Sequence, residues 1–316
     1  MKILNNKAKQ FLTLIVKLAI IGLAFYFVKN QLAEKPLNLD ILKESLNGKY
    51  AYLYIFIILL LTFLNRFIEI LKWRNLIQVI EKISVWESTK QVLSAITLGI
   101  FTPNGIGEYA GKVLFYKKEE AGKVVLLNMI CNGVQVIYAI SFGLIGVFYI
   151  NHLHNFMPDV YFLYLFLILA AAVFIILSVK NIQIKGFSLQ SIFKYIGEIP
   201  KKIHRKNLIL AFFRYFVLMN QYFFLYKLFD VEIPYFVLIG VVSAVYLLAS
   251  SLPNFQIIDF ALKGSVAIFL FGLFGVNEWV IAIVATLIWM LNLVIPISIG
   301  SLFVLFYKPN KTIEAK

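Results

Sequence analysis

Long uninterrupted runs of apolar residues decide the environment in which this chain can fold. Three of them, at 11–28, 161–179 and 280–307, reach or approach the roughly 20 residues that an α-helix needs to cross about 30 Å of hydrocarbon. None alternates apolar and polar residues as the strands of a membrane barrel do. Hydrophobic residues make up 61% of the 316 residues, whereas a soluble domain is nearer half apolar. The sequence therefore predicts an all-α polytopic membrane protein rather than a soluble enzyme.

The positions of lysine and arginine predict how the chain is oriented. Six full crossings are expected, at about 11–29, 50–73, 122–150, 160–179, 207–228 and 279–307. The net charge is +14, from 30 Lys and Arg against 16 Asp and Glu, and the excess of cations falls in loops on one side, as is typical of cytoplasmic loops. We therefore expect a bacterial cytoplasmic membrane protein with both termini in the cytoplasm. Its partners should be anionic phospholipid headgroups rather than nucleic acid.

The most basic stretch, residues 180–206, is expected to lie at the membrane surface. Within it Ile192, Phe193, Ile196 and Ile199 fall on one face of a helix. This pattern is typical of an amphipathic helix in the plane of the interface.

Two apolar segments are too short to cross a membrane comfortably. The first, 88–101, stops at TPNGIG, and the cluster of lysines that follows indicates a return to the same side, so residues 86–119 are predicted to form a re-entrant hairpin. The second, 235–251, stops at SSLPNFQIID before the chain continues as a further apolar segment. A second re-entrant hairpin is predicted there.

The two breaks resemble each other. PN-GIGEYAGK aligned with PNFQIIDFALK pairs the proline, the asparagine, the acid and the lysine of one break with those of the other. The whole chain, 1–316, then reads as a single membrane domain with one repeat at about 50–150 and a second at about 207–307. The span before the first hairpin is expected to run inward and the span before the second to run outward. The two repeats are therefore expected to be inverted relative to each other, which is a recurring plan of secondary transporters.

Residues at the two breaks are the first candidates for a substrate site: Pro103, Asn104, Gly105, Gly107, Pro253 and Asn254. Proline interrupts a helix and glycine lets the backbone turn sharply and be approached closely. A helix restarting at about 106 would direct its N-terminal N–H groups into a cavity, where an anion such as phosphate is favoured. The alternative is a structural kink without a ligand.

Charged residues after each break form a second set of candidates. Glu108 with Lys112 and Asp259 with Lys263 are spaced as i,i+4 ion pairs, and Arg214 lies about seven residues inside its crossing. Each charge at mid-membrane costs at least about 2.5–3.5 kcal/mol, so a functional role is the default expectation. Lysines would meet a phosphate and the acids an amine or a hydroxyl, unless the pairs only neutralise each other.

Three amides in one crossing complete the candidate site. Asn128, Asn132 and Gln135 are spaced to lie on a single face of a helix, where they line a cavity or bind neighbouring helices. By contrast, Arg66 and Glu69 are expected to form a local pair near the end of their crossing.

Catalytic and metal chemistry have little support in the sequence. Cys131 lies in an apolar stretch and is expected to be a buried small side chain, and His152 and His154 form only a weak metal signal. No nucleophile, nucleotide-binding or zinc motif is present. The sequence predicts neither an enzyme nor a cofactor.

The segments NRFIEILKWRNLI, TPNGIGEYAGK and LPNFQIID resemble the lysylphosphatidylglycerol synthase transmembrane region, a family of flippase-like integral membrane proteins. The resemblance covers nearly the whole chain. It implies a domain that binds or moves lipids, in some members aminoacylated phosphatidylglycerol delivered to the outer leaflet. It also implies a substrate role for Glu108 with Gly105 and Gly107. The second hairpin departs from the family pattern, because Phe255, Gln256, Ile257, Ile258 and Asp259 stand where glycines and a glutamate are usual.

These observations lead to one preferred function and two alternatives. We expect a flippase-like transporter that moves an anionic or aminoacylated phospholipid, or a polyprenyl-linked lipid, between leaflets. The first alternative is a membrane subunit of a lipid-modifying enzyme, although no segment resembles the soluble aminoacyltransferase domain of the full-length synthases. The second is a carrier of small polar solutes or ions.

Overall fold

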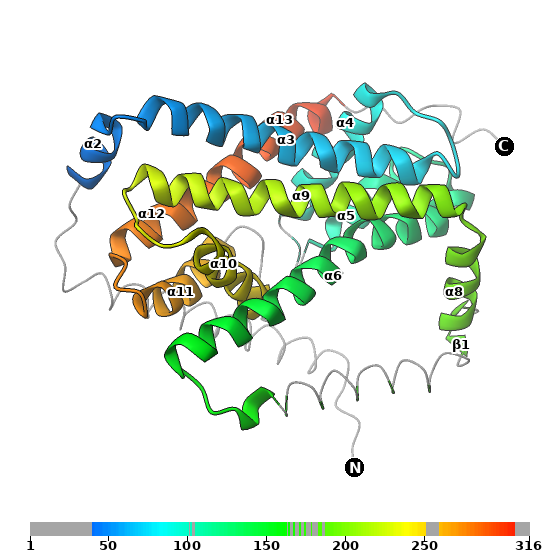
Figure 1. The fold of residues 1–316 in the computed structure, drawn as a ribbon. Coiled ribbons are helices and arrows are strands. Elements are labelled where there is room, and N and C mark those ends of the chain that lie inside the picture. Colours follow the sequence, from blue (N-terminus) through cyan, green and yellow to red (C-terminus); the bar gives the residue numbers. More distant parts are fainter. Residues whose placement is uncertain are drawn as a thin grey trace, which may run out of the picture.

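The computed structural model describes residues 40–100, 102, 105–162, 183–184, 187–250 and 259–306, together with isolated positions between 164 and 178. The predicted crossing at 11–29, most of the crossing at 160–179, and Pro103, Asn104, Pro253 and Asn254 lie outside this part. Nearly all of the described chain is helical (Figure 1). The exception is a hairpin of two short antiparallel strands, β1 (Gln183–Ile184) and β2 (Phe187–Ser188).

The helices follow one another with short connections. In chain order they are α2 (Asp40–Asn47), α3 (Ala51–Ile77), α4 (Val85–Gly99), α5 (Gly107–Val113), the 3₁₀ turn η1 (Lys118–Glu120), α6 (Ala121–His154), α8 (Leu189–Glu198), α9 (Lys201–Leu228), α10 (Tyr235–Ser250), α11 (Asp259–Gly272), α12 (Glu278–Trp289), the π-helical turn η3 (Met290–Val294) and α13 (Ile295–Leu305).

Among the described residues, four helices are long and apolar enough to cross a membrane, which indicates a helical, polytopic membrane protein. They are Ala51–Ile77, Lys118–His154, Lys201–Leu228 and Glu278–Leu305. Their outer faces carry large exposed apolar side chains such as Phe56, Phe63 and Phe212, as expected for helices surrounded by lipid. These four helices correspond to four of the six predicted crossings.

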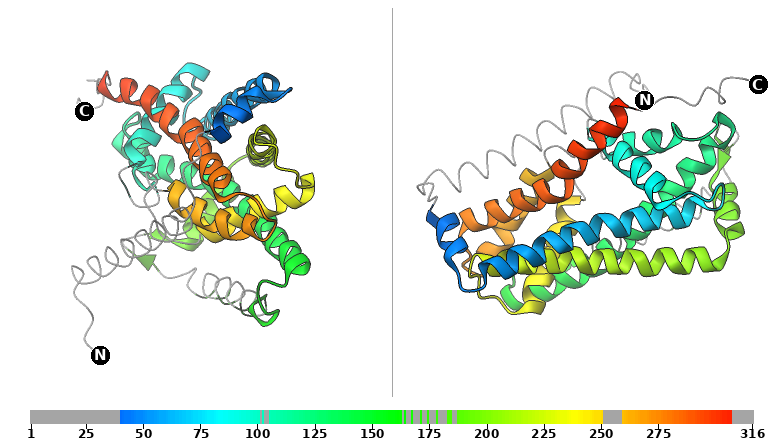
Figure 2. Two further views of the ribbon diagram at one scale, coloured as in Figure 1. Left: turned by 90° about the vertical axis from the view of Figure 1, so that its left-hand side faces the viewer. Right: turned by 90° about the horizontal axis from the view of Figure 1, so that it is seen from above.

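The antiparallel helices α3 and α9 lie side by side along the length of the bundle (Figures 1 and 2). Helix α6 packs against α10, and α13 packs against α4. Small residues make these contacts close: a Cβ atom on Gly146 of α6 would lie 2.3 Å from the carbonyl oxygen of Gly240 on α10, and one on Gly300 of α13 would lie 2.3 Å from that of Leu93 on α4. Membrane helices commonly approach one another at such small residues. Lipid provides no hydrophobic driving force between helices, so close backbone packing holds them together instead.

Two apolar clusters mark opposite ends of the bundle. One contains Ile77, Ile83, Tyr116 and Ile199. The end of α3 and the starts of α4, α6 and α9 therefore lie near one another. At this end α8 covers the cluster with Tyr195, and a helix is therefore confirmed within the predicted basic segment 180–206.

The other cluster contains Ala51, Ile150, Leu228 and Ile233, where α3 begins, α6 and α9 end, and the chain leads into α10. This second cluster continues into the contacts among α6, α9, α10, α11 and α12 and is the larger of the two.

Each pair of shorter helices starts from a different end. Helix α4 begins beside the end of α3, with Ser84 and Glu87 forming a capping box, and α5 packs back along it to the start of α6. Helices α10 and α11 form the corresponding pair at the other end, between α9 and α12. Helix α4 has 15 residues and α10 has 16, so each is about 22–24 Å long, against about 40 Å for the 27 residues of α3. Helices α4 and α10 are therefore clearly shorter than the long helices that they pack against.

Candidate functional site

A charged cavity of about 220 Å³ lies where the two helix pairs meet the long helices. Its walls come from α3, α4, α5, α9, α10, α11, α12 and η3. The lining residues are Arg66, Glu69, Ile96, Glu108, Arg214, Tyr222, Tyr246, Asp259, Phe260, Lys263, Ala285, Ile288, Trp289, Asn292 and Leu293. Four of the residues predicted for a substrate site, Glu108, Arg214, Asp259 and Lys263, therefore lie together.

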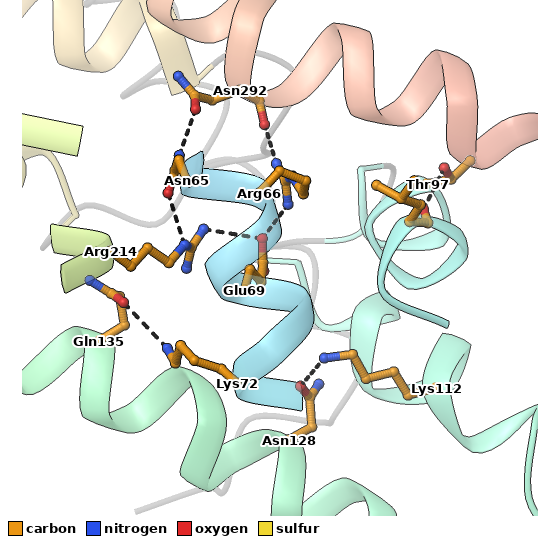
Figure 3. Close-up of polar contacts among 11 residues, drawn as sticks. Asn65, Arg66, Glu69, Lys72, Thr97, Lys112, Asn128, Gln135, Arg214 and Asn292 are labelled. Atoms are coloured by element: carbon orange, nitrogen blue, oxygen red, sulfur yellow. Dashed lines mark hydrogen bonds and ion pairs between the residues drawn. The ribbon is translucent and has the colours of Figure 1, made fainter. Parts of the chain in front are cut away.

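Glu69 holds two arginines from different helices at one wall of this cavity. Its Oε2 atom accepts from Nη1 of Arg66, one turn away on α3, and from Nη2 of Arg214 on α9 at 3.2 Å (Figure 3). Arg214 also donates from Nε to Asn65 Oδ1 at 3.0 Å. Glu69 is only 7% exposed, so these charges are removed from solvent. The local Arg66–Glu69 pair is confirmed, and Arg214 extends it across α3 and α9.

The π-helical turn η3 brings Asn292 into this network. Arg66 Nη2 donates to the backbone carbonyl of Asn292, and Asn65 Nδ2 donates to its Oδ1 at 2.6 Å. Asn292 Nδ2 in turn donates to Gln221 Oε1 of α9 at 2.9 Å. Isolated π-turns occur often at functional sites, because the wider turn redirects side chains and carbonyls. Here it joins the last crossing to α3 and α9.

A second charged pair faces the cavity from α11. Lys263 Nζ donates to Asp259 Oδ2 at 2.5 Å, which confirms the predicted i,i+4 pair. The same ammonium lies 4.4 Å from the ring centroid of Tyr246, within the range of a cation–π contact. Tyr222 donates from its hydroxyl to that of Tyr246 at 3.3 Å. This side of the cavity is therefore both charged and aromatic.

Glu108, at the start of α5, lies beside the first arginine of the cluster. Its carboxylate interacts electrostatically with Arg66. Gly99 of α4 makes room for it, since a Cβ atom there would lie 2.7 Å from Glu108 Cγ. Glu108 and Asp259 thus belong to the first turns of the second helix in each pair, and both line the cavity.

The predicted Glu108–Lys112 pair is wrong for the described chain. Lys112 is 2% exposed, donates from Nζ to Asn128 Oδ1 of α6 at 2.6 Å, and lies 4.3 Å from the ring centroid of Trp73. It makes no ion pair with a carboxylate among the described residues. The physical reason is that α5 packs against α4 and α6, so that Lys112 is held between Asn128 of α6 and Trp73 of α3 rather than facing the cavity.

The three amides of α6 lie on one face, as predicted, and that face contacts neighbouring helices. Asn128 Oδ1 accepts from Lys112, and Gln135 Oε1 accepts from Lys72 Nζ at 3.3 Å (Figure 3). Asn132, the third amide, is partly buried. None of the three lines the charged cavity. Of the two predicted possibilities, helix contact is therefore the one observed.

The turn between α4 and α5 accounts for both predicted glycines. Gly105 has a φ of 70°, which favours glycine, and a Cβ atom on Gly107 would lie 2.3 Å from the carbonyl oxygen of Leu98. The Gly107 N–H donates to Thr102 Oγ1 at 2.7 Å and so closes the turn. Neither glycine lines the cavity.

Several members of the network were not predicted from the sequence. Lys72 is not among the predicted site residues, yet its side chain is fully buried and hydrogen-bonded to Gln135. Its spacing of three from Glu69 and seven from Asn65 could have placed it on the polar face of α3. Asn292 and Trp289 stand in an uninterrupted apolar run and gave no such signal.

The formal charges that line the cavity balance. Three cations, Arg66, Arg214 and Lys263, stand with three carboxylates, Glu69, Glu108 and Asp259. Lys72 and Lys112 do not line the cavity; they are buried and hydrogen-bonded to the neutral amides of Gln135 and Asn128, so they add positive charge to the interior of the described bundle. Arg66 Nε is buried without a hydrogen-bond acceptor within the described chain. An anion in the cavity would therefore meet charged donors and lie in a positively charged interior.

The described residues contain no group of three or more His, Cys, Asp and Glu side chains able to hold a metal ion. No family model matches the sequence, and a search of curated proteins finds no match. The resemblance to the lysylphosphatidylglycerol synthase transmembrane region therefore stays a prediction from the sequence.

Proposed function

We propose that this protein binds the anionic headgroup of a membrane lipid in the charged cavity and moves that lipid between the two leaflets. The observation that carries the proposal is a cavity lined by three cations and three carboxylates, enclosed by helices that are apolar enough to cross a membrane. Charged groups at such a position are expensive and are retained mainly along substrate paths. A phospholipid or polyprenyl-linked phosphate is the anion that a bilayer itself supplies.

The arginine cluster is suited to a phosphate. Guanidinium groups bind phosphate oxygens through paired N–H donors, and Arg66 Nε has no acceptor within the described chain. Glu69 holds Arg66 and Arg214 in place before a ligand arrives. A headgroup phosphate beside them would share these donors with Glu69.

The wall formed by α11 and its neighbours is suited to the cationic part of a headgroup. Asp259 supplies negative charge beside Lys263, and the rings of Tyr246, Phe260 and Trp289 supply aromatic surface. An ammonium group is attracted by both features. This arrangement supports an aminoacylated or zwitterionic headgroup as substrate, in agreement with the family resemblance.

The contact pattern supports an inverted repeat. The proposed repeats match α3 with α9, α4 with α10, α5 with α11, and α6 with the segment from α12 to α13. Under this match the contact between α6 and α10 corresponds to the contact between α13 and α4, and the contact between α5 and α6 corresponds to that between α11 and α12. All four contacts are present. On this proposal, α4–α5 and α10–α11 are re-entrant hairpins from opposite faces, and movement of one repeat against the other opens the cavity to each side in turn.

A carrier of small anions is the second candidate, and the size of the cavity favours it. A volume of about 220 Å³ accommodates a phosphate or a small carboxylate as readily as a headgroup. The two functions differ in whether the substrate leaves the membrane. A small anion is released into water, whereas a lipid headgroup remains attached to hydrocarbon chains in the bilayer.

Reconstituted vesicles separate these functions. We expect Arg214→Gln, Glu108→Gln and Lys263→Gln each to slow the transfer of fluorescent phosphatidylglycerol between leaflets at least about tenfold, since losing one partner of a desolvated charge pair costs 2–5 kcal/mol. Glu120→Gln and Lys123→Gln are matched controls, because these two residues form an ion pair of 3.2 Å, the same length as the Arg214–Glu69 pair, but outside the cavity and partly exposed to solvent.

Normal lipid transfer in Glu108→Gln and Lys263→Gln would remove the proposed site. Uptake of radiolabelled inorganic phosphate by the unmodified protein, without lipid transfer, would instead identify a small-anion carrier.

A further inference from the structure

A second polar pocket, of about 190 Å³, lies at the end of the bundle where α3 ends and α9 begins. The end of α3, the connection to α4 and the first turns of α9 form its walls. The lining residues are Leu71, Arg74, Asn75, Gln78, Lys82, Ile83 and Lys206. None of these residues lines the charged cavity, so the two sites are separate.

Cations from all three segments meet in this pocket. Arg74 comes from α3, Lys82 from the connection and Lys206 from α9, and all three are solvent-exposed. None forms an ion pair within the described chain, and no carboxylate lines the pocket. Three cations without ion-pair partners around one concave surface favour an anion that can accept several hydrogen bonds.

Hydrogen bonds hold the pocket walls together. Arg74 donates from Nε to the carbonyl oxygen of Ile83 at 3.0 Å, which fixes the guanidinium and leaves its two terminal nitrogens for a ligand. Asn75 Nδ2 donates to the carbonyl oxygen of Ile203 at 2.9 Å and so joins α3 to α9. The site is therefore built before a ligand binds.

The surroundings of the pocket identify the source of the anion. It opens at the ends of two helices long and apolar enough to cross a membrane, which is the level of the lipid headgroups. Lys201, Lys202 and Arg205, exposed on the first turns of α9, surround it with further positive charge. Loops on this side are the ones that the positive-inside rule assigns to the cytoplasm.

Nearby acids do not neutralise the pocket. Glu87 is engaged in the capping box with Ser84, and Glu81 does not line the pocket. Basic pockets between membrane helices at this level are known to bind anionic headgroups.

We infer that the basic pocket formed by Arg74, Lys82 and Lys206 binds the phosphate of one anionic phospholipid from the adjoining leaflet. Arg74 contacts the phosphate through its planar fork, and the two lysines approach it from the other segments. The bound lipid connects α3, the α3–α4 connection and α9. This binding is independent of transport through the charged cavity.

Native mass spectrometry of the purified full chain tests this inference. Phosphatidylglycerol is added to delipidated protein in detergent, and the apparent affinity of the tightest bound lipid is measured. The variant Arg74→Gln/Lys82→Gln/Lys206→Gln is compared with Lys201→Gln/Lys202→Gln/Arg205→Gln, which removes the same charge from the same region but leaves the pocket intact. The pocket variant is expected to bind at least about tenfold more weakly than the control.

Three further comparisons make the result decisive. An equal loss of lipid affinity in the two triple variants would overturn the inference, because it would show that the lipid is attracted by the general positive charge of this surface and not by the pocket. Competition by millimolar inorganic phosphate as effective as that by the lipid would overturn the assignment to a lipid. The double variant Lys82→Gln/Lys206→Gln keeps the Arg74–Ile83 hydrogen bond and replaces the triple variant if that one does not fold. Unchanged lipid affinity in the double variant would also contradict the proposal.

Arg214→Gln separates this result from the transport proposal. Because Arg214 lines only the charged cavity, this variant should keep the lipid bound at the basic pocket. Loss of that lipid in Arg214→Gln would place it in the charged cavity and overturn the second site.

Discussion

At the scale of single residues, the position of Glu69 determines whether the centre of the bundle is stable. One carboxylate oxygen accepts from both Arg66 and Arg214, and little of the side chain is exposed. Removing one partner of a buried ionic group is far more costly than the net value of the pair, because an unpaired charge is left in a poorly solvated site. In this case two guanidinium groups would lose their shared acceptor.

The variant Glu69→Gln is therefore expected to destabilise the folded protein strongly. Breaking a buried pair in this way costs about 3–5 kcal/mol, so the melting temperature in detergent should fall by at least several degrees. Glu44→Gln, on the exposed side of α2, is the matched control and should melt like the unmodified protein. A melting temperature that is the same in both variants would show that Glu69 does not hold the arginines together.

The predictability of these residues depends on where their partners stand in the sequence. The Asp259–Lys263 pair is local, so the spacing of four on one helix was enough to predict it. Lys112 has the same spacing from Glu108, yet its partner Asn128 comes from another helix. Only the packing of α5 on α6 selects that partner, and a single sequence does not contain this information.

At the scale of helices, close backbone contact at glycine explains the α6–α10 pair. Gly146 has no space for a side chain, whereas nothing lies within 4 Å of a Cβ atom at Gly133 on the same helix. The two positions therefore separate the effect of packing from that of helix propensity.

Gly146→Ala should lower the melting temperature by several degrees, because forcing a methyl group into a packed contact typically costs about 1–3 kcal/mol. Gly133→Ala should be neutral or stabilising, since alanine favours a helix by up to about 1 kcal/mol. Thermal unfolding in detergent checks both variants side by side. Equal melting temperatures would mean that α6 and α10 are not in the observed contact.

The sequence predicted helices better than the deviations within them. Four described crossings follow from the length of their apolar runs, and the break between α4 and α5 follows from the proline and glycines of TPNGIG. The π-turn around Asn292 was not predicted, because nothing local interrupts the apolar run. Apart from a bond to the carbonyl oxygen of Ile288 one turn earlier, its polar contacts are with Asn65, Arg66 and Gln221, all more than 70 residues away.

At the scale of the whole molecule, the two ends of the bundle carry the transport proposal. The cluster with Tyr116 and Ile199 lies at one end and the cluster with Leu228 and Ile233 at the other, and one pair of shorter helices starts from each. If α3, α6 and α9 cross the membrane, these clusters lie on opposite sides of it. The α4–α5 and α10–α11 pairs then approach the cavity from opposite faces.

Accessibility of single cysteines tests this arrangement directly. Cys131 is the only cysteine and is 1% exposed, so Cys131→Ala gives a background without thiols. In that background, Lys117→Cys and Glu232→Cys place one exposed thiol beside each end of the bundle. In intact cells a membrane-impermeant maleimide should label Glu232→Cys, and Lys117→Cys should react only after the membrane is opened, because the lysine-rich side faces the cytoplasm. Labelling of both from the same side would place the two helix pairs on one face, and a cavity that opens alternately between inverted repeats could not then form.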